Sequence, residues 1–306
     1  MSISQKNVIY PHSLSKGDTI GIVAPAGPFD RHLFDQGVSI IKGMGFATRI
    51  DEQLFLRNGY LAGADSARTA HFNAMVADDK VRALICARGG YGSLRMLTGL
   101  DYEKIRQAAK PVIGFSDITA LHRAILLKSG LVTFHGPMVT TLAGIDDDSR
   151  NRWYDTLTDP VPAPMKLSGV RVLKPGFARG MLAGGNLATL CHLTGTWVAG
   201  SLKGSILLLE DVGEAVYRID RMLTQLKMAD MFEGLTGVVL GEFKNCGPAE
   251  QIEDLFMQIF GDRDIPIVSG APVGHGSRNW TVPMGIQAVM DTDREELRFL
   301  LPAVRE

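Results

Sequence analysis

Short apolar runs alternate with amphipathic stretches along the first half of the chain. Buried strands read as continuous apolar runs, whereas surface helices place apolar residues three or four positions apart. In chain order the pattern predicts a strand at 19–26, a helix at 29–44, a short strand near 47–50, a helix at 66–77, a strand at 81–87, a helix at 93–97, a strand at 111–115, a helix at 117–128 and a strand at 131–134. This alternation indicates a parallel sheet with helices on both faces.

The composition changes near the middle of the chain. Residues 159–164 read DPVPAP, and prolines at this density favour an extended connector. We therefore predict an N-terminal domain over 1–160, a linker over 161–177 and a C-terminal domain over 178–306. The predicted elements of the second half are a strand from 180 that breaks at a glycine turn, a helix to 193, strands at 205–209, 237–240, 266–269, 286–291 and 296–301, and helices at 217–228 and 250–260.

Composition and charge exclude several classes of protein. The 306 residues suffice for two domains of ordinary size, and 45% hydrophobic with 21% charged residues are globular values. A net charge of −1 gives no reason to expect nucleic acid or an anionic membrane as a partner. No apolar run reaches the length of a membrane span, and Met1–Lys16 lacks the apolar core of a signal peptide. We expect a soluble, cytoplasmic protein.

Cysteine and histidine usage argues against a metal centre. Cys86, Cys191 and Cys246 lie far apart without metal-ligand spacing, so buried reduced thiols are expected, as in a reducing compartment. None of the seven histidines forms H-x-x-x-H or pairs with a nearby cysteine. We therefore expect no structural zinc site.

A serine lies where an apolar strand meets a helix. Ser116 follows the strand at 111–115 and precedes a helix that begins at about Asp117. A serine on such a turn has the geometry of a nucleophile elbow, which projects the hydroxyl toward the first helical amides. The pattern G-x-S-x-G is half met, because Gly114 is present and Ile118 replaces the second glycine. The alternative is a serine that only caps the helix.

A nucleophilic serine needs a base and a group that orients the base. Glu210 ends an apolar strand, where carboxylates commonly face a crevice, although it could equally belong to the acids at the next helix start. His275 lies between Gly274 and Gly276, so its imidazole could reach a partner or lie on the surface. His135 ends a strand of the serine's own sheet and is the rival base or a substrate-binding group.

The glycine-rich segment Arg88–Gly92 follows a strand. Its spacing departs from G-x-G-x-x-G and no G-K-S/T follows, so dinucleotide or phosphate binding is disfavoured. An oxyanion hole is the better functional interpretation, with the amides of Gly90 and Asp117 converging on a carbonyl attacked by Ser116. Arg88 could clamp a substrate carboxylate or form a salt bridge to a neighbouring acid.

Several motifs occur together in one order along the chain. They are GIVAPAGP at 21–28, ARGGYG at 87–92, GFSDIT at 114–119, HGPM at 135–138, GGNL at 184–187, LEDV at 209–212, YRIDR at 217–221 and GHG at 274–276. In this order the chain resembles the LD-carboxypeptidases, or muramoyltetrapeptide carboxypeptidases, from roughly Gly17 to the C-terminus. We predict an α/β fold with a parallel N-terminal sheet and flanking helices, flavodoxin- or amidotransferase-like, plus a smaller C-terminal α/β domain.

The resemblance implies a serine peptidase whose site lies in the groove between two domains. Carried onto this sequence, Ser116 is the nucleophile, His275 the general base and acid, and Glu210 its orienting partner. The amides of Gly90 and Asp117 would bind the oxyanion. The resemblance also implies action without metal or cofactor on a small peptide, the murein tetrapeptide, with release of the terminal D-alanine in cell-wall recycling. It implies a homodimer as well.

Two other functions stay open at this point. One branch of the family provides immunity to peptide-nucleotide antibiotics and has a longer insertion before the catalytic glutamate. The stretch 163–204 is short for that insertion, which favours the murein-recycling branch. A two-domain binding protein without chemistry would use Ser116 as a cap and Arg88 as a clamp. An amidotransferase-like enzyme is disfavoured, because that chemistry uses a cysteine at the elbow and Cys86 lies within a strand.

Overall fold

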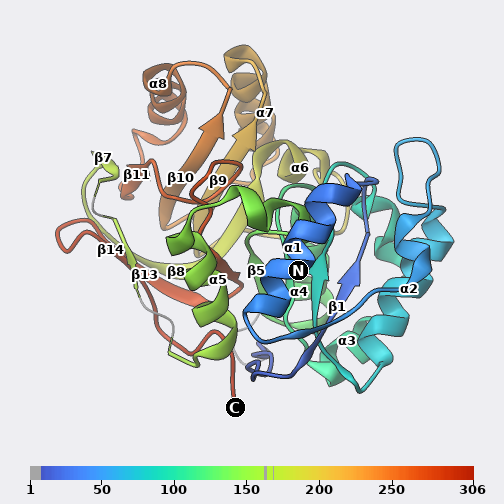
Figure 1. The fold of residues 1–306 in the computed structure, drawn as a ribbon. Coiled ribbons are helices and arrows are strands. Elements are labelled where there is room, and N and C mark those ends of the chain that lie inside the picture. Colours follow the sequence, from blue (N-terminus) through green and yellow to red (C-terminus); the bar gives the residue numbers. More distant parts are fainter. Residues whose placement is uncertain (1–7, 162–163, 168) are drawn as a thin grey trace.

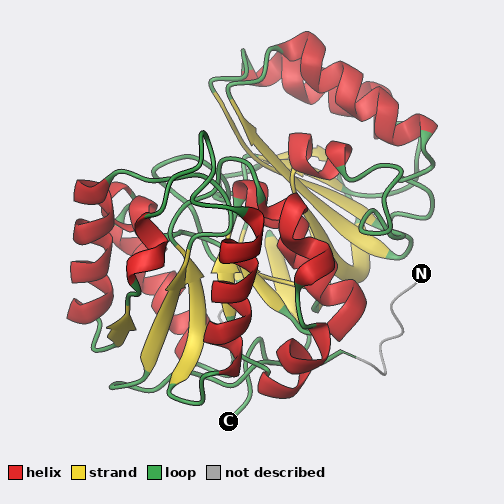
Figure 2. Ribbon diagram, turned by 90° about the vertical axis from the view of Figure 1, so that its right-hand side faces the viewer, coloured by secondary structure: helices red, strands yellow, loops and turns green. Residues whose placement is uncertain are grey.

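Two β-sheets stand side by side, each covered by helices (Figures 1 and 2). The computed structural model of the protein describes residues 8–161, 164–167 and 169–306. The N-terminal half of the chain builds most of a six-stranded sheet, and the C-terminal half builds an eight-stranded sheet. The α/β fold predicted from the alternating pattern is confirmed.

Five parallel strands and one antiparallel edge strand form the N-terminal sheet. The strands are β1 (Thr19–Val23), β2 (Ala47–Arg49), β3 (Val81–Cys86), β4 (Val112–Gly114), β5 (Thr133–His135) and β12 (Val282–Met284). Their spatial order is β12-β5-β4-β3-β1-β2. Strand β12 comes from the far end of the chain and pairs antiparallel with β5. The central strands β3 and β4 are almost entirely buried, which explains their continuous apolar sequence.

Helices pack on both faces of this sheet. They are α1 (Arg31–Gly43), α2 (Asp65–Ala77), α3 (Tyr102–Ala108), α4 (Thr119–Ser129) and α5 (Asp147–Thr158), with short 3-10 turns η2 (Glu52–Phe55), η3 (Ser93–Gly99), η4 (Ser116–Ile118) and η5 (Val139–Gly144). Helix α1 buries Phe34, Val38 and Ile41, which lie on one face at helical spacing. It begins after Asp30, whose carboxylate accepts a hydrogen bond from the amide of Leu33 at 2.9 Å.

The C-terminal sheet is mixed. Its strands are β6 (Met165–Lys166), β7 (Arg171–Lys174), β8 (Phe177–Asn186), β9 (Ser205–Val212), β10 (Gly237–Lys244), β11 (Ile267–Ser269), β13 (Gln287–Asp291) and β14 (Glu296–Phe299). In the order β6-β14-β13-β8-β9-β10-β11-β7, the four strands from β8 to β11 are parallel. Helices α6 (Leu187–His192), α7 (Val216–Met228) and α8 (Ala249–Phe260) pack on one apolar face. No helix in the described part of the chain is long and apolar enough to cross a membrane.

Some elements differ from the sequence prediction. The predicted linker 161–177 contributes the edge strands β6 and β7, and its positions 162, 163 and 168 lie outside the described residues. Strand β8 does not break at its glycines but runs on to Asn186, because Gly184, at φ +116°, lies directly against β9. The pattern does not indicate α3, α5 or β12. The domain boundaries themselves stay a prediction.

The two halves meet closely at the start of α4. The hydroxyl of Thr119 accepts a hydrogen bond from the backbone amide of Asn186 at 3.0 Å. A Cβ on Gly185 would lie 2.6 Å from Thr119 Oγ1, so only glycine lets the end of β8 approach α4 this closely. Apolar residues of α4 and α6 belong to one buried cluster that draws on both halves. The helix that follows Ser116 is therefore held against the C-terminal sheet.

Two glycines of α1 provide a matched test of this packing. A Cβ on Gly37 would overlap the carbonyl oxygen of Val139 in η5, whereas a Cβ on Gly43 would meet nothing within 4 Å. We expect Gly37→Ala to lower the free energy of unfolding by about 1–3 kcal/mol through overpacking. Gly43→Ala should leave it unchanged or raise it by up to about 1 kcal/mol, because alanine favours helix. Urea denaturation measures both, and equal effects would contradict the packing of α1 on η5.

Candidate active site

Ser116 lies on a strained turn between β4 and η4. Its φ of +64° is in the left-handed region, which a residue other than glycine adopts only where its surroundings hold it. Phe115 before it is extended, and its carbonyl accepts a hydrogen bond from the amide of Ile118 at 3.3 Å. The backbone therefore has the shape of a nucleophile elbow.

Two glycines let the backbone pass close to this turn. A Cβ on Gly89 would lie 3.1 Å from Ser116 Cβ and 3.3 Å from its Oγ. A Cβ on Gly114 would lie 2.9 Å from Ile118 Cγ1. Because Gly114 has no side chain, the turn accommodates Ile118 at the position where the full elbow pattern has a second glycine.

The two residues predicted for the oxyanion hole lie next to Ser116. Asp117 follows it in the chain, and Gly90, with φ +109°, follows the glycine packed against it. The Asp117 carboxylate accepts the amide of Ser93 at 2.8 Å, and the Ser93 hydroxyl donates to the Asp117 carbonyl at 2.6 Å. Burial raises the pKa of Asp117. These contacts tie η3 to the elbow, and the predicted role of the Asp117 and Gly90 amides stays a prediction.

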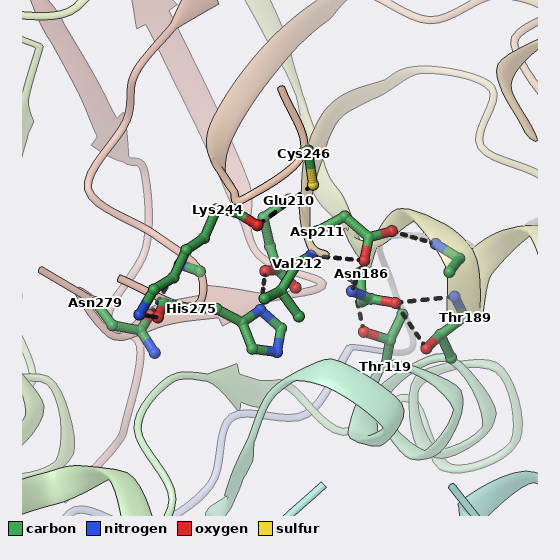
Figure 3. A network of polar contacts seen from close by, with 12 residues as sticks. Thr119, Asn186, Thr189, Glu210, Asp211, Val212, Lys244, Cys246, His275 and Asn279 are labelled. Carbon is green, nitrogen blue, oxygen red and sulfur yellow. Dashed lines mark hydrogen bonds and ion pairs between the residues drawn. The ribbon is translucent and has the colours of Figure 1, made fainter. Parts of the chain in front are cut away.

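Glu210 and His275 form a direct pair. Nδ1 of His275 lies 2.7 Å from Oε2 of Glu210, which is fully buried near the end of β9. Burial raises the pKa of Glu210, and the hydrogen bond from His275 acts in the opposite direction. With the carboxylate as acceptor, Nδ1 carries the hydrogen, and Nε2 has a free lone pair in the neutral form of the imidazole. In Figure 3 one ring nitrogen of His275 faces Glu210 and the other points away from it, and the His275 side chain is 18% exposed.

The ring of Phe115 connects the elbow to this pair. Its centroid lies 4.7 Å from that of His275 and 5.8 Å from that of His135. Because Phe115 directly precedes Ser116, the three predicted residues Ser116, Glu210 and His275 gather at one place. They come from the end of β4, the end of β9 and the loop between β11 and β12.

That loop, residues 270–281, is here called the histidine loop, and it crosses close over the ends of β9 and β10. A Cβ on Gly274, at φ +132°, would lie 2.9 Å from Oε2 of Glu210. A Cβ on Gly241 in β10 would overlap the carbonyl oxygen of Val273. Glycine at these positions lets the loop bring its imidazole onto a buried carboxylate.

Helix α5 holds the histidine loop against the N-terminal half. The amide of Asn279 donates to the hydroxyl of Ser149 at 3.0 Å. The indole N–H of Trp280 donates to the carboxylate of Asp148 at 2.8 Å. A helix that the sequence pattern does not indicate thus positions the residues that follow His275.

His135 packs against the ring of Phe115, which also contacts His275, and it is fully buried. Neither ring nitrogen has a hydrogen-bond partner among the described residues. Burial lowers the pKa of His135 well below its usual value, and the neighbouring His122 and His275 act in the same direction. A neutral imidazole with no exposed surface results, and its part as rival base or substrate-binding group stays a prediction.

Arg88 is exposed beside the glycine-rich segment. Its Nη1 donates to the carbonyl of Pro28 at 2.7 Å. Within residues 8–161, 164–167 and 169–306, no acidic side chain lies within 4.0 Å of its guanidinium, so the salt-bridge alternative is not observed. The carboxylate clamp stays a prediction.

Asn186 is a polar residue of the site that the sequence argument did not assign. Its side-chain amide donates to Asp211 at 3.0 Å, and its carbonyl oxygen accepts the amide of Thr189 at 2.9 Å (Figure 3). Asp211 also accepts the amide of Ala188 at 2.8 Å. Asp211 therefore binds the start of α6 and not the start of α7, the helix after β9. Glu210, the preceding residue, instead contacts His275. An asparagine directly before a predicted helix is the available signal.

The described residues offer no obvious place for a metal ion. No group of three or more histidine, cysteine, aspartate or glutamate side chains among them is arranged to hold one. The three cysteines are unpaired and buried. Burial raises the pKa of Cys86, which keeps that thiol protonated.

Comparison with known families supports the resemblance seen in the motifs. The model of the LD-carboxypeptidase N-terminal domain matches residues 20–136, and that of the C-terminal domain matches residues 179–290. A probable murein peptide carboxypeptidase of Bacillus subtilis (strain 168) is 39% identical over 291 residues, covering 92% of this chain and 91% of its own. A murein tetrapeptide carboxypeptidase of Pseudomonas aeruginosa is 31% identical over 291 residues, covering 90% and 94%.

Solved structures show the same fold. A muramoyltetrapeptide carboxypeptidase from Oxalobacter formigenes aligns with a TM-score of 0.81 at 28% identity, covering 92% of this chain and 97% of its own. MccF in complex with glutamyl sulfamoyl guanosine aligns with a TM-score of 0.88 at 23% identity, covering 97% and 99%. The two family models cover most of the chain, and the predicted resemblance is confirmed. The chain belongs to the LD-carboxypeptidase family.

Proposed function

We propose that the protein is a serine carboxypeptidase that releases the terminal D-alanine from a murein tetrapeptide. The observation that carries the proposal is the buried Glu210–His275 pair, 2.7 Å apart, packed through Phe115 against the strained turn of Ser116. A serine, a histidine and a buried acid close together are the residues of a catalytic triad for acyl transfer. The murein peptides in the names of the Bacillus and Pseudomonas relatives support the substrate class.

The reaction proceeds through an acyl-enzyme. Ser116 Oγ attacks the carbonyl that precedes D-alanine, while Nε2 of His275 takes the hydroxyl proton. The amides of Gly90 and Asp117 stabilise the negative charge on the carbonyl oxygen. His275 then gives its proton to the leaving D-alanine nitrogen, and water deprotonated by the same histidine releases the shortened peptide. Glu210 holds the imidazole in the required tautomer and stabilises the imidazolium.

A related activity is the second candidate. The microcin C7 self-immunity protein MccF of Escherichia coli is 26% identical over 332 residues, covering 96% of both chains. The same serine, histidine and glutamate could cleave an acyl group from a nucleotide. Incubation with aspartyl sulfamoyl adenosine beside the murein tetrapeptide decides between the two, since release of sulfamoyl adenosine alone would favour the immunity-type activity. A covalent serine probe that labels Ser116 excludes a binding protein without chemistry.

Replacement of Ser116 provides a test of the nucleophile. We expect Ser116→Ala to lower D-alanine release by roughly 10³-fold or more, because no acyl-enzyme can form. Ser116→Gly should lose activity equally and raise the free energy of unfolding by about 1 kcal/mol, because glycine adopts a positive φ without strain. Mass spectrometry of the products and urea denaturation provide the two measurements, with the exposed Ser201→Ala as control. Full activity in Ser116→Ala would overturn the proposal.

The raised pKa of Glu210 predicts how stability depends on pH. Its ordinary value is 4.5, and burial raises it in the folded state. In the folded protein Glu210 therefore keeps its proton to a higher pH than in the unfolded chain. The free energy of unfolding falls as pH rises from the unfolded pKa of Glu210 to the folded one, and it levels off above that range. Glu210→Gln cannot ionise and escapes this loss. We expect its melting temperature to gain on wild type from about pH 4.5 upward, while activity is lost.

Thermal unfolding between pH 4 and pH 8 measures this difference. Glu233→Gln is the matched control, because Glu233 is an exposed carboxylate with a side chain 69% accessible. A gap between Glu210→Gln and wild type that stays constant over the whole pH range would contradict the burial effect.

A further inference from the structure

A hydrogen bond in the glycine-rich segment Arg88–Gly92 fixes the direction of the predicted oxyanion donor. The carbonyl of Gly89 accepts the amide of Gly27, in the loop after β1, at 3.1 Å. The peptide between Gly89 and Gly90 is trans, and the C=O and N–H bonds of a planar trans peptide point in opposite directions. The amide of Gly90 therefore points away from Gly27. Among the described residues it has no hydrogen-bond acceptor.

A buried arginine contacts both of these loops. Arg68 lies on α2 and is 5% exposed. Its Nη1 donates to the carbonyl of Pro25 after β1 and, at 3.0 Å, to the carbonyl of Gly92 after β3. Its Nε donates to the carbonyl of Gly63 at 3.3 Å, and its Nη2 pairs with Asp65. One guanidinium thus joins three segments of backbone, two of which follow parallel strands of the N-terminal sheet.

The peptide between Gly92 and Ser93 is held at both of its polar groups. Arg68 binds the carbonyl oxygen, and the Asp117 carboxylate accepts the N–H of Ser93 at 2.8 Å. Burial raises the pKa of Asp117, and the positive charge of Arg68 acts in the opposite direction. Hydrogen bonds to charged partners are stronger than those between neutral groups. The end of the glycine-rich segment is therefore fixed to α2 on one side and to the residue after Ser116 on the other.

A second arginine binds the same acid but a different set of groups. Arg95 Nε donates to the two carboxylate oxygens of Asp65 at 3.0 and 2.8 Å, with the Arg95 side chain 43% exposed. Among the described residues, the Arg95 side chain donates neither to the carbonyl of Pro25 nor to that of Gly92. The contacts to the loop carbonyls thus distinguish Arg68 from its neighbour.

We propose that Arg68 is a positioning residue of the reaction, which acts through the Gly90 amide by holding the glycine-rich segment against the turn of Ser116. This inference rests on the proposed function. An oxyanion donor stabilises the transition state most when it is oriented in advance, because no reorganisation is then needed as charge develops. Loss of the guanidinium frees the loop carbonyls, and a displacement of about 1 Å near a reacting centre lowers the rate by about 10²-fold.

Two variants at Arg68 test the assignment. We expect Arg68→Met to lower kcat for D-alanine release by roughly 10²-fold, the effect of one misplaced oxyanion donor, with KM changed by less than about 3-fold. Arg68→Lys keeps the charge and loses the planar fork, so its kcat should be restored in part, to roughly 10-fold below wild type. The folded fraction is measured by circular dichroism and kcat is expressed per folded molecule, so a loss of stability alone leaves kcat unchanged.

Arg95→Met is the matched control. It removes a guanidinium from the same carboxylate of Asp65 and leaves Arg68 bound to the loop carbonyls. Exposed ion pairs contribute little to stability, so its kcat should stay within about 2-fold of wild type. If Arg95→Met lowers kcat as much as Arg68→Met does, or if Arg68→Met raises KM and keeps kcat, the positioning role is overturned.

A fluorophosphonate distinguishes the failure of this inference from that of the proposed function. Ser116 Oγ attacks the phosphorus, fluoride leaves and His275 takes the hydroxyl proton, so the rate of labelling depends on the oxyanion hole and not on a murein peptide. If no peptide is cleaved but Arg68→Met is labelled roughly 10²-fold more slowly than wild type, the positioning role stands and the proposed substrate is wrong.

The remaining outcomes contradict the inference. If wild type cleaves the tetrapeptide and the Arg68 variants match it in kcat and in the rate of labelling, the positioning role is overturned and the carboxypeptidase remains. If wild type neither cleaves the peptide nor is labelled at Ser116, the positioning role and the proposed function are both overturned.

Discussion

A carboxylate buried at the end of a strand sets the geometry of the whole candidate site. Glu210 is fully buried and its contact with His275 is 2.7 Å, so the histidine loop must descend onto the sheet to reach it. That descent is possible only where backbone replaces side chains, at Gly241 and Gly274. The bulge in β10 lies opposite Glu210, between the pairs Leu240–Leu209 and Phe243–Asp211.

Two residues of the candidate site are in locally unfavourable conditions, one in its backbone conformation and one in its burial. Ser116 has a positive φ, and burial raises the pKa of Glu210. Each is sustained by structure that extends well beyond the site. The hydrogen bond between Thr119 and Asn186 fixes the elbow helix against the C-terminal sheet, and α5 fixes the histidine loop against the N-terminal half. Strain at a site of this kind persists only where surrounding packing determines it.

Elements with their own hydrophobic period could be predicted from the sequence, as α1, α7 and α8 illustrate. Helix α5 escapes such reasoning because most of its residues are polar, with Trp153 and Leu157 as its buried apolar positions. Strand β12 has three residues, too few for a period, and its partner lies in the other half of the chain. Motifs identify Ser116, Glu210 and His275 as candidates, but no spacing predicts that Phe115 packs on His275. The bulge that carries Glu242 is likewise a property of strand register, which the sequence of one strand does not contain.

The pairing of β12 with β5 has a consequence for the order in which the protein is made. Residue 282 pairs with residue 135, so the N-terminal sheet keeps an open edge at β5 until residue 282 has left the ribosome. Contacts this distant in sequence form late in folding. The histidine loop is tied to β11 in one sheet and to β12 in the other, and it cannot take its final position before that edge closes. In a nascent chain the turn of Ser116 is therefore made well before His275 can reach Glu210, and the candidate site is assembled only after β12 has paired with β5.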